Sequence, residues 1–209
     1  MSEPLTHTAH RWVAQSLEAG ELAIDATAGN GQDTAFLARQ VGACGMVLAI
    51  DCQQSAISRT QERLDTQELR PRVVLVTGDH ADLLTLTPQH WHGRVGAVMF
   101  NLGYLPGGDR ARVTLPATTC RGLTAASALL RPGGVLSVLA YRGHQGGPDE
   151  AAAVEDWMAR AQRYGAVEWS VHHSGNPSGP VLHCLRVTES TPTATTLMTT
   201  IQEESRWPS

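Results

Sequence analysis

The stretch that most constrains the fold of this chain is LAIDATAGNGQDT, at residues 22–34. It predicts an apolar strand, a turn containing Gly29 and Gly31, and the start of a helix that continues through AFLA. Because glycine has no Cβ, such a turn lets a ligand approach the backbone N–H groups closely. We therefore expect a nucleotide-sized ligand here, with Asp25, Gly29 and Gly31 as candidate cofactor-binding residues.

The turn departs from the dinucleotide fingerprint G-x-G-x-x-G, because Thr34 occupies the position of the third glycine. A second apolar strand at 46–51 nevertheless ends in a carboxylate, Asp51. In doubly wound folds an acid at the tip of the second strand, about 20 residues beyond the glycines, accepts hydrogen bonds from a ribose. The two features together predict an adenosine-bearing cofactor.

Composition narrows the class of protein. The chain has 209 residues, 42% of them hydrophobic and 17% charged, and no apolar run approaches the ~18 residues that cross a bilayer. We expect one soluble, cytoplasmic domain without a secretion signal. The four cysteines lack C-x-x-C spacing and His90 and His92 look like loop residues, so no metal site or disulfide framework is expected.

The charged residues exclude further chemistries. All 16 basic residues are arginines, which excludes a Schiff-base lysine and a P-loop lysine. The net charge of −4 argues against a surface that coats nucleic acid generally, yet it permits a local arginine patch over a site that handles RNA.

The rest of the chain alternates helices and strands. We expect helices at about 6–19, 33–41, 55–64, 116–130 and 149–164, and strands at about 22–25, 46–51, 73–77, 95–100, 135–140, 166–173 and 181–187, with RPGG at 131–134 as a break before the fifth strand. The loop between the last two strands is too short for a helical crossover, so they should form a hairpin with an antiparallel last strand.

This plan resembles that of class I methyltransferases. We expect an α/β, Rossmann-like fold: a mostly parallel seven-stranded sheet with helices on both faces and an antiparallel last strand. The methyltransferase domain would occupy 1–187, and the Thr- and Ser-rich segment 188–209 would be a weakly ordered tail.

Polar residues follow the strand ends that parallel strands bring to one edge. Asp79 and His80 follow the third strand and either converge on the adenine or form a polar turn. Asp33 begins a helix and either complements the helix dipole or contacts the ligand. By contrast, His7 and His10 are expected to be solvated helix residues.

The loops after the fourth and fifth strands are left for a substrate. In a methyl-transfer reaction, Asn101 and its neighbours Leu102, Gly103 and Tyr104 supply oxygen atoms and a ring that hold an amino nitrogen and stack on a flat base. A pure turn is the alternative. In the second loop, Tyr141 and His144 are candidates to accept or relay the amine's proton, although His144 could instead order its glycine-rich loop.

Three motifs together resemble a known family: DATxGNGxDT at 25–34, FNLGYLPGGD at 100–109 and YxGH at 141–144. They are similar to the bacterial family first labelled rRNA methylases, whose members are understood as tRNA 5-(aminomethyl)-2-thiouridine methyltransferases. The resemblance implies S-adenosylmethionine as donor and methylation of the aminomethyl nitrogen on the wobble uridine of a tRNA anticodon stem-loop. By position, it implies cofactor contacts for Asn30, Asp33, Asp51, Gln53, Asp79 and His80, and contacts to the modified base for Asn101, Tyr104 and His144.

The resemblance extends to further substrate-binding residues: Leu102, Gly103, Pro106, Asp109, Arg110 and Arg142, with Arg110, Arg112, Arg121 and Arg142 available for phosphate contacts. The chain departs from the family in its lack of lysine, in Asp79 where serine is common, and in its tail. Open alternatives are a methyltransferase for rRNA or a small amine, a nicotinamide-dependent oxidoreductase, and either a monomer or a homodimer.

Overall fold

The computed structural model describes residues 3–103, 114–163, 167–176 and 178–188. Its strands are β1 (Leu22–Asp25), β2 (Met46–Asp51), β3 (Val73–Thr77), β4 (Val95–Leu102), β5 (Leu130–Ala140), β6 (Val167–His173) and β7 (Val181–Val187). Its helices are α1 (Leu5–Ala14), α2 (Gln32–Gln40), α3 (Gln54–Thr66), α4 (Leu83–Leu86), α5 (Pro116–Leu129) and α6 (Gly147–Arg163), with 3₁₀ turns at Arg70–Arg72, His80–Asp82 and Gln89–Trp91.

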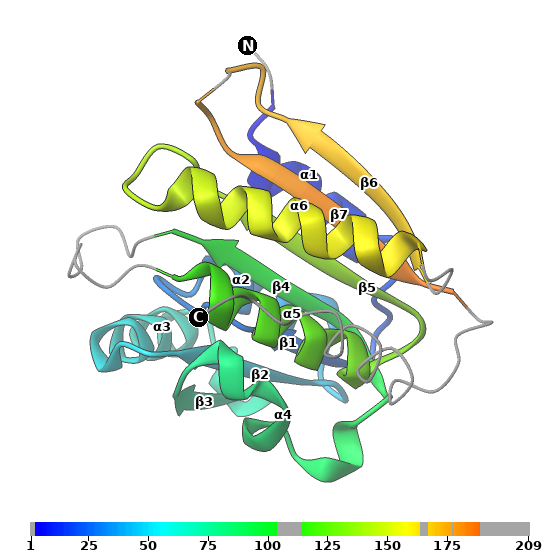
Figure 1. Ribbon diagram of the computed structural model, residues 1–209. Helices are drawn as coiled ribbons and strands as arrows, with labels where there is room; N and C mark the ends of the chain where they lie inside the picture. Colours follow the sequence, from blue (N-terminus) through cyan, green and yellow to red (C-terminus); the bar gives the residue numbers. More distant parts are fainter. Residues whose placement is uncertain (1–2, 104–113, 164–166, 177, 189–209) are drawn as a thin grey trace.

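All seven strands form one sheet in the order β3-β2-β1-β4-β5-β7-β6 (Figure 1). The strands β1 to β5 pair in parallel, whereas β7 runs antiparallel to both of its neighbours, β5 and β6. This arrangement confirms the predicted hairpin and the antiparallel last strand.

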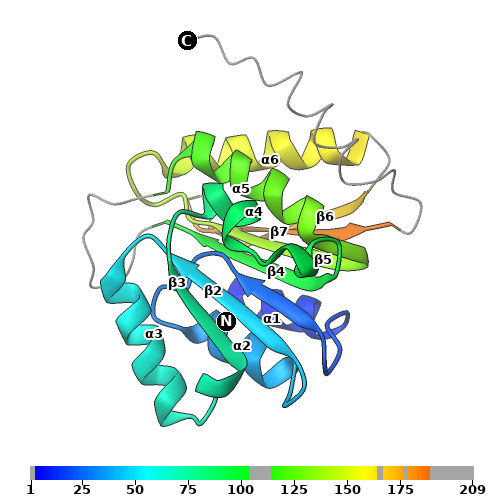
Figure 2. The same cartoon turned by 90° about the horizontal axis from the view of Figure 1, so that it is seen from below.

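Helices cover both faces of the sheet, as predicted. Helices α4, α5 and α6 lie on one face and α1, α2 and α3 on the other (Figure 2). Alternate strand residues point to opposite faces, so Ile24, Leu48 and Phe100 pack in the core under α5 and α6. On the other face, Ala23 and Met99 pack in a second core under α1 and α2. Because residues on both faces of β2 and β4 are buried, the sequences of these strands are continuous apolar runs.

The predicted break at 131–134 was wrong. Strand β5 begins at Leu130, which pairs with Val95, and the register then jumps to a pair between Val135 and Ala97. The intervening RPGG segment forms a bulge inside the strand rather than a gap before it. Arg131 fixes the bulge, because its Nε donates to Glu21 Oε1 at 2.5 Å.

Two other predicted boundaries moved. Helix α1 ends at Ala14 rather than near residue 19, and β4 continues through Asn101 to Leu102, because both residues still pair with β5. Thr188 is the only residue of the expected tail that the structure describes. In the described part of the chain, no helix combines the length and apolar character needed to cross a membrane.

Candidate methyl-donor and acceptor site

A cavity of about 400 Å³ opens at the edge where the parallel strands β1 to β5 end. The residues that line it lie at or just after the end of each of these strands, on α1 and α2, and in or just before the first turn of α5. They are Thr6, Ala26, Thr27, Ala28, Gly29, Asn30, Gln32, Asp33, Asp51, Cys52, Gln53, Asp79, His80, Asn101, Leu102, Gly103, Thr114, Leu115, Thr118 and Tyr141. The convergence of five strand ends on one edge brings together Ala26 and Tyr141, which are 115 positions apart in the sequence (141 minus 26).

Asp25 lies beneath the glycine turn rather than in the cavity wall. Its side chain is fully buried, and it accepts hydrogen bonds from Thr34 Oγ1 at 2.5 Å and from the Thr27 N–H at 3.1 Å. Burial, and secondarily the nearby Asp33 carboxylate, raises the pKa of Asp25 to about 7. Thr34, the departure from the dinucleotide fingerprint, therefore supplies a hydroxyl that holds the buried carboxyl group.

Gly31 also lies outside the cavity lining, and close packing explains why it is glycine. It has a positive φ of 76°, and a Cβ at this position would lie 2.9 Å from Thr60 Cα on α3. Gly29 does line the cavity, and its N–H donates to Asp51 Oδ2 at 2.9 Å. The Gln53 N–H donates to the other oxygen of Asp51 at 2.9 Å. The carboxylate of Asp51 thus joins the turn to the end of β2.

A polar chain that sequence reasoning missed links α1 to the acceptor side of the cavity. His10 Nε2 lies 2.6 Å from Asp33 Oδ1, and the His10 ring stacks on Phe36 with centroids 4.0 Å apart. Asn101 Nδ2 donates to the second oxygen, Asp33 Oδ2, at 3.4 Å. Because the Asn101 N–H also donates to Thr27 Oγ1 at 2.7 Å, both the backbone and the side chain of Asn101 are fixed.

His10 is not the solvated helix residue that the sequence predicts, because its ring contacts Asp33 and Phe36. No local pattern could have connected it with Asp33, which stands 23 positions later on another helix. The sequence predicts a helix ahead of β1, but it does not indicate which residues that helix packs against.

The acceptor side of the cavity carries an exposed aromatic and apolar rim. Tyr141 and Leu115 are 39% and 56% exposed, and both line the cavity. Burial of the ring, aided by the Asp33 charge, raises the pKa of Tyr141 above 10, so the phenol stays protonated at neutral pH. His144 is absent from the lining, but a Cβ on Gly103 would come within 3.6 Å of its Nε2.

Asp79 and His80 both reach the cavity, as the sequence predicted for their position after β3. Asp79 also accepts a hydrogen bond from the Ala81 N–H at 2.8 Å. His80 is 8% exposed and meets the Phe100 ring edge-on, with centroids 5.7 Å apart. Burial lowers the pKa of His80, against the opposing effect of Asp79 and Asp51, so its imidazole is neutral at pH 7.

The cavity is anionic. Three carboxylates, those of Asp33, Asp51 and Asp79, line it, and none of the arginines that the structure describes does so. Such a wall favours a cationic ligand and opposes a pyrophosphate or another anion. Within the described ranges, no group of three or more histidine, cysteine or acidic side chains is placed to hold a metal ion.

The arginines expected at the substrate are elsewhere or outside the described residues. Arg142 Nε donates to the Gly179 carbonyl at 2.9 Å, and Arg121 pairs with Asp82 at 3.0 Å on the surface. The other predicted substrate residues of the fourth-strand loop lie outside the described ranges: Tyr104, Pro106, Asp109, Arg110 and Arg112.

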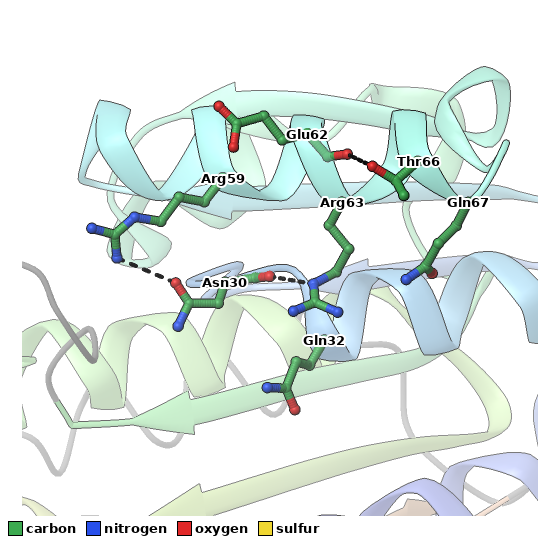
Figure 3. Close-up of a pocket in the computed structure, with 7 residues that line it drawn as sticks. All are labelled: Asn30, Gln32, Arg59, Glu62, Arg63, Thr66 and Gln67. Atoms are coloured by element: carbon green, nitrogen blue, oxygen red, sulfur yellow. Dashed lines mark hydrogen bonds between the residues drawn. The ribbon is translucent and has the colours of Figure 1, made fainter.

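A second hollow, of about 390 Å³, lies behind the glycine turn between α2 and α3 (Figure 3). Arg63 Nε donates to the Asn30 carbonyl at 2.6 Å, and Arg59 Nη1 donates to Asn30 Oδ1 at 3.3 Å. Asn30 and Gln32 line both this hollow and the main cavity, so the glycine turn forms a common wall.

The strand order, the single antiparallel strand and the position of the cavity define the fold as that of the class I methyltransferases. Residues 47–184 match the family model described as "Putative rRNA methylase", and the chain belongs to this family. Residues 1–82, less than half of the chain, also match the model of protein-L-isoaspartate(D-aspartate) O-methyltransferase.

Individual relatives agree with this assignment. The chain is 39% identical over 158 residues to a chloroplastic tRNA (mnm⁵s²U34)-methyltransferase of Arabidopsis thaliana, a match that covers 72% of this chain and 57% of the plant protein. It also resembles the crystal structure of a "putative rRNA-methylase" from Clostridium thermocellum (TM-score 0.83, 32% identity, 90% of this chain and 99% of that one). The crystal structure of a "putative methyltransferase" from Streptococcus mutans in complex with SAH is similar as well (TM-score 0.78, 28% identity, 90% of this chain and 99% of that one).

Proposed function

We propose that this protein is an S-adenosylmethionine-dependent N-methyltransferase that converts 5-aminomethyl-2-thiouridine to 5-methylaminomethyl-2-thiouridine at the tRNA wobble position. The observation that carries the proposal is the carboxylate-lined cavity next to the fixed side chain of Asn101. The Arabidopsis relative, named for the corresponding tRNA nucleoside, supports the choice of substrate.

The charge of the cavity supports the choice of donor. S-adenosylmethionine carries a sulfonium cation and an ammonium group, which three lining carboxylates attract. A nicotinamide dinucleotide carries a pyrophosphate, which the same carboxylates repel and for which the lining offers no arginine. We assign Asp51 and Gln53 to the ribose, Asp79 and His80 to the adenine, and Asp33 with the glycine turn to the methionine part. When bound, the donor supplies an electrophilic methyl group.

The orientation of Asn101 supports an amine as the acceptor. A carboxylate can only accept hydrogen bonds, so Asp33 sets the Asn101 amide with its NH₂ toward Asp33 and its Oδ1 away from it. That oxygen is suited to accept a hydrogen bond from a substrate amine and thereby to aim the nitrogen lone pair. Transfer to the methyl group requires an in-line approach, so this positioning is the main contribution of Asn101.

The rim and the wall supply the remaining roles. Tyr141 and Leu115 offer a partly exposed aromatic and apolar platform for a flat base. Because its phenol stays protonated, Tyr141 serves as a platform and hydrogen-bond donor rather than as the base. Asp33, which contacts His10 through one oxygen and Asn101 through the other, holds the Asn101 amide in this orientation.

The test uses purified protein, methyl-labelled S-adenosylmethionine and two tRNA preparations that differ in one group. We expect label to enter tRNA that bears 5-aminomethyl-2-thiouridine and not tRNA that lacks the amine. Equal labelling of both would contradict the assigned acceptor. Calorimetric titration tests the donor separately: tight binding of NADH without binding of S-adenosylhomocysteine would contradict the methyltransferase assignment itself.

A further inference from the structure

The arginine-lined hollow behind the glycine turn has a chemistry opposite to that of the main cavity. Two guanidinium groups, from Arg59 and Arg63, line it together with the amide side chains of Asn30, Gln32 and Gln67. Glu62 is the one acidic residue of the lining, and its carboxylate points away from both guanidinium groups in Figure 3. The side chains that face the hollow are therefore cationic or hydrogen-bond donors.

Arg63 retains binding capacity in this position. A guanidinium has five N–H donors, and among the described residues Arg63 donates only through Nε, to the Asn30 carbonyl. This bond holds the base of the guanidinium against the turn. The two terminal nitrogens, which have no acceptor among the described residues, extend toward Gln32 at the hollow (Figure 3). A guanidinium that is held through Nε and keeps both terminal nitrogens for a ligand suits an oxyanion with two oxygens in one plane.

We propose that this hollow binds a phosphate of the RNA substrate's backbone, with Arg63 as the contact. The inference rests on the proposed function, because it takes RNA as the substrate. An anionic cavity repels the phosphates on either side of the target nucleoside. A polyanion can approach such a cavity only if cationic groups lie outside its wall, and Arg63 stands directly behind that wall.

The position of the site also gives it an effect on the donor. Asn30 and Gln32 are shared by both hollows, and the Thr60 hydroxyl donates to the Gly29 carbonyl at 3.3 Å. Residues 59, 60 and 63 of α3 thus hold the glycine turn from behind. A phosphate bound by Arg63 would stiffen the same turn that forms the donor cavity.

The experiment measures the affinity of the full-length protein for an anticodon stem-loop RNA over a range of salt concentrations. The logarithm of the binding constant falls linearly with the logarithm of the salt concentration, and each lost phosphate contact makes this negative slope less steep by about 0.7 to 0.9. We expect this decrease, and severalfold weaker binding at low salt, for Arg63→Gln, whereas Arg63→Lys keeps most of the slope because it keeps the charge. The matched control is Arg94→Gln, which removes an exposed arginine just before β4, at the opposite edge of the sheet, and should leave the slope unchanged.

Affinity for S-adenosylhomocysteine, measured by calorimetry on the same variants, separates the two roles of Arg63. An unchanged salt slope in Arg63→Gln would overturn the phosphate site, and weaker donor binding alongside it would show that Arg63 only holds the turn. Equal loss of slope in Arg94→Gln would also overturn it, as a general charge effect. Failure of the wild-type protein to bind any RNA would instead contradict the proposed RNA substrate, and the phosphate site with it.

Discussion

The buried carboxyl group of Asp25 makes the stability of the fold depend on pH in a direction opposite to that of most acidic residues. Asp25 is fully buried at the end of β1, and burial is the main cause that raises its pKa from 3.8 to about 7. A group whose folded-state pKa is raised favours folding while it is protonated. Its contribution is therefore fully present below pH 3.8 and is lost as the pH rises through about 7.

The magnitude follows from the two pKa values. Between about pH 5 and about pH 8 the folded state releases the proton that the unfolded state has already lost, which lowers the free energy of unfolding by about 2 to 3 kcal/mol. The substitution Asp25→Asn keeps the size of the side chain and removes the titration. We expect the stability of this variant relative to the wild type to increase by about 2 to 3 kcal/mol over that range.

Urea denaturation at the two pH values measures this difference, provided the m-value is the same for both proteins. Asp82→Asn is the matched control, because Asp82 pairs with Arg121 on the surface, where such pairs contribute little. A difference in stability between Asp25→Asn and wild type that stays constant with pH would contradict the raised pKa of Asp25. So would a wild-type protein that gains stability relative to the variant as the pH rises.

Two other predictions concern the site. Asn101→Ala should slow turnover about a hundredfold and leave donor affinity unchanged, because it removes a group that positions the acceptor. Asp51→Ala should weaken donor binding at least about tenfold, because it removes a charged hydrogen-bond acceptor. Single-turnover kinetics and calorimetry measure the two effects, and the opposite pattern would exchange the roles of the two residues. His10→Ala should slow turnover about tenfold through loss of its contact with Asp33. Phe36→Leu removes only the stacked ring, so equal slowing in this control would argue against a specific role of His10.

The sheet could be predicted from sequence because its strands are short, apolar and sharply bounded. Strands β2, β3 and β7 have the predicted limits, because a glycine or a proline directly precedes or follows each of them. The RPGG segment at 131–134 misled the prediction because proline and glycine mark breaks in an isolated sequence. In the fold, the pair formed by Arg131 and Glu21 holds this segment as a bulge.

The site was predictable where it depends on strand ends and unpredictable where it depends on packing between helices. Asp51, Asp79 and Asn101 reach the cavity because parallel strands present like ends at one edge. Nothing in the local sequence, however, indicates that His10 approaches Asp33 or that Arg63 supports the glycine turn, since both contacts join separate helices or loops. The burial of Asp25 is likewise not indicated by the local sequence, because the Thr34 hydroxyl donates a hydrogen bond to the buried carboxyl group only in the folded chain.

The proposed reaction of this protein is the methylation of an amine on the wobble uridine of tRNA. Mass spectrometry of wobble nucleosides, from cells with and without the gene, tests it most directly. We predict that deletion converts 5-methylaminomethyl-2-thiouridine into accumulated 5-aminomethyl-2-thiouridine and that restoring the gene reverses the change, whereas an Asn101→Ala copy does not. Identical wobble nucleosides in the two strains, with a methyl group missing from another RNA, would contradict the proposed substrate.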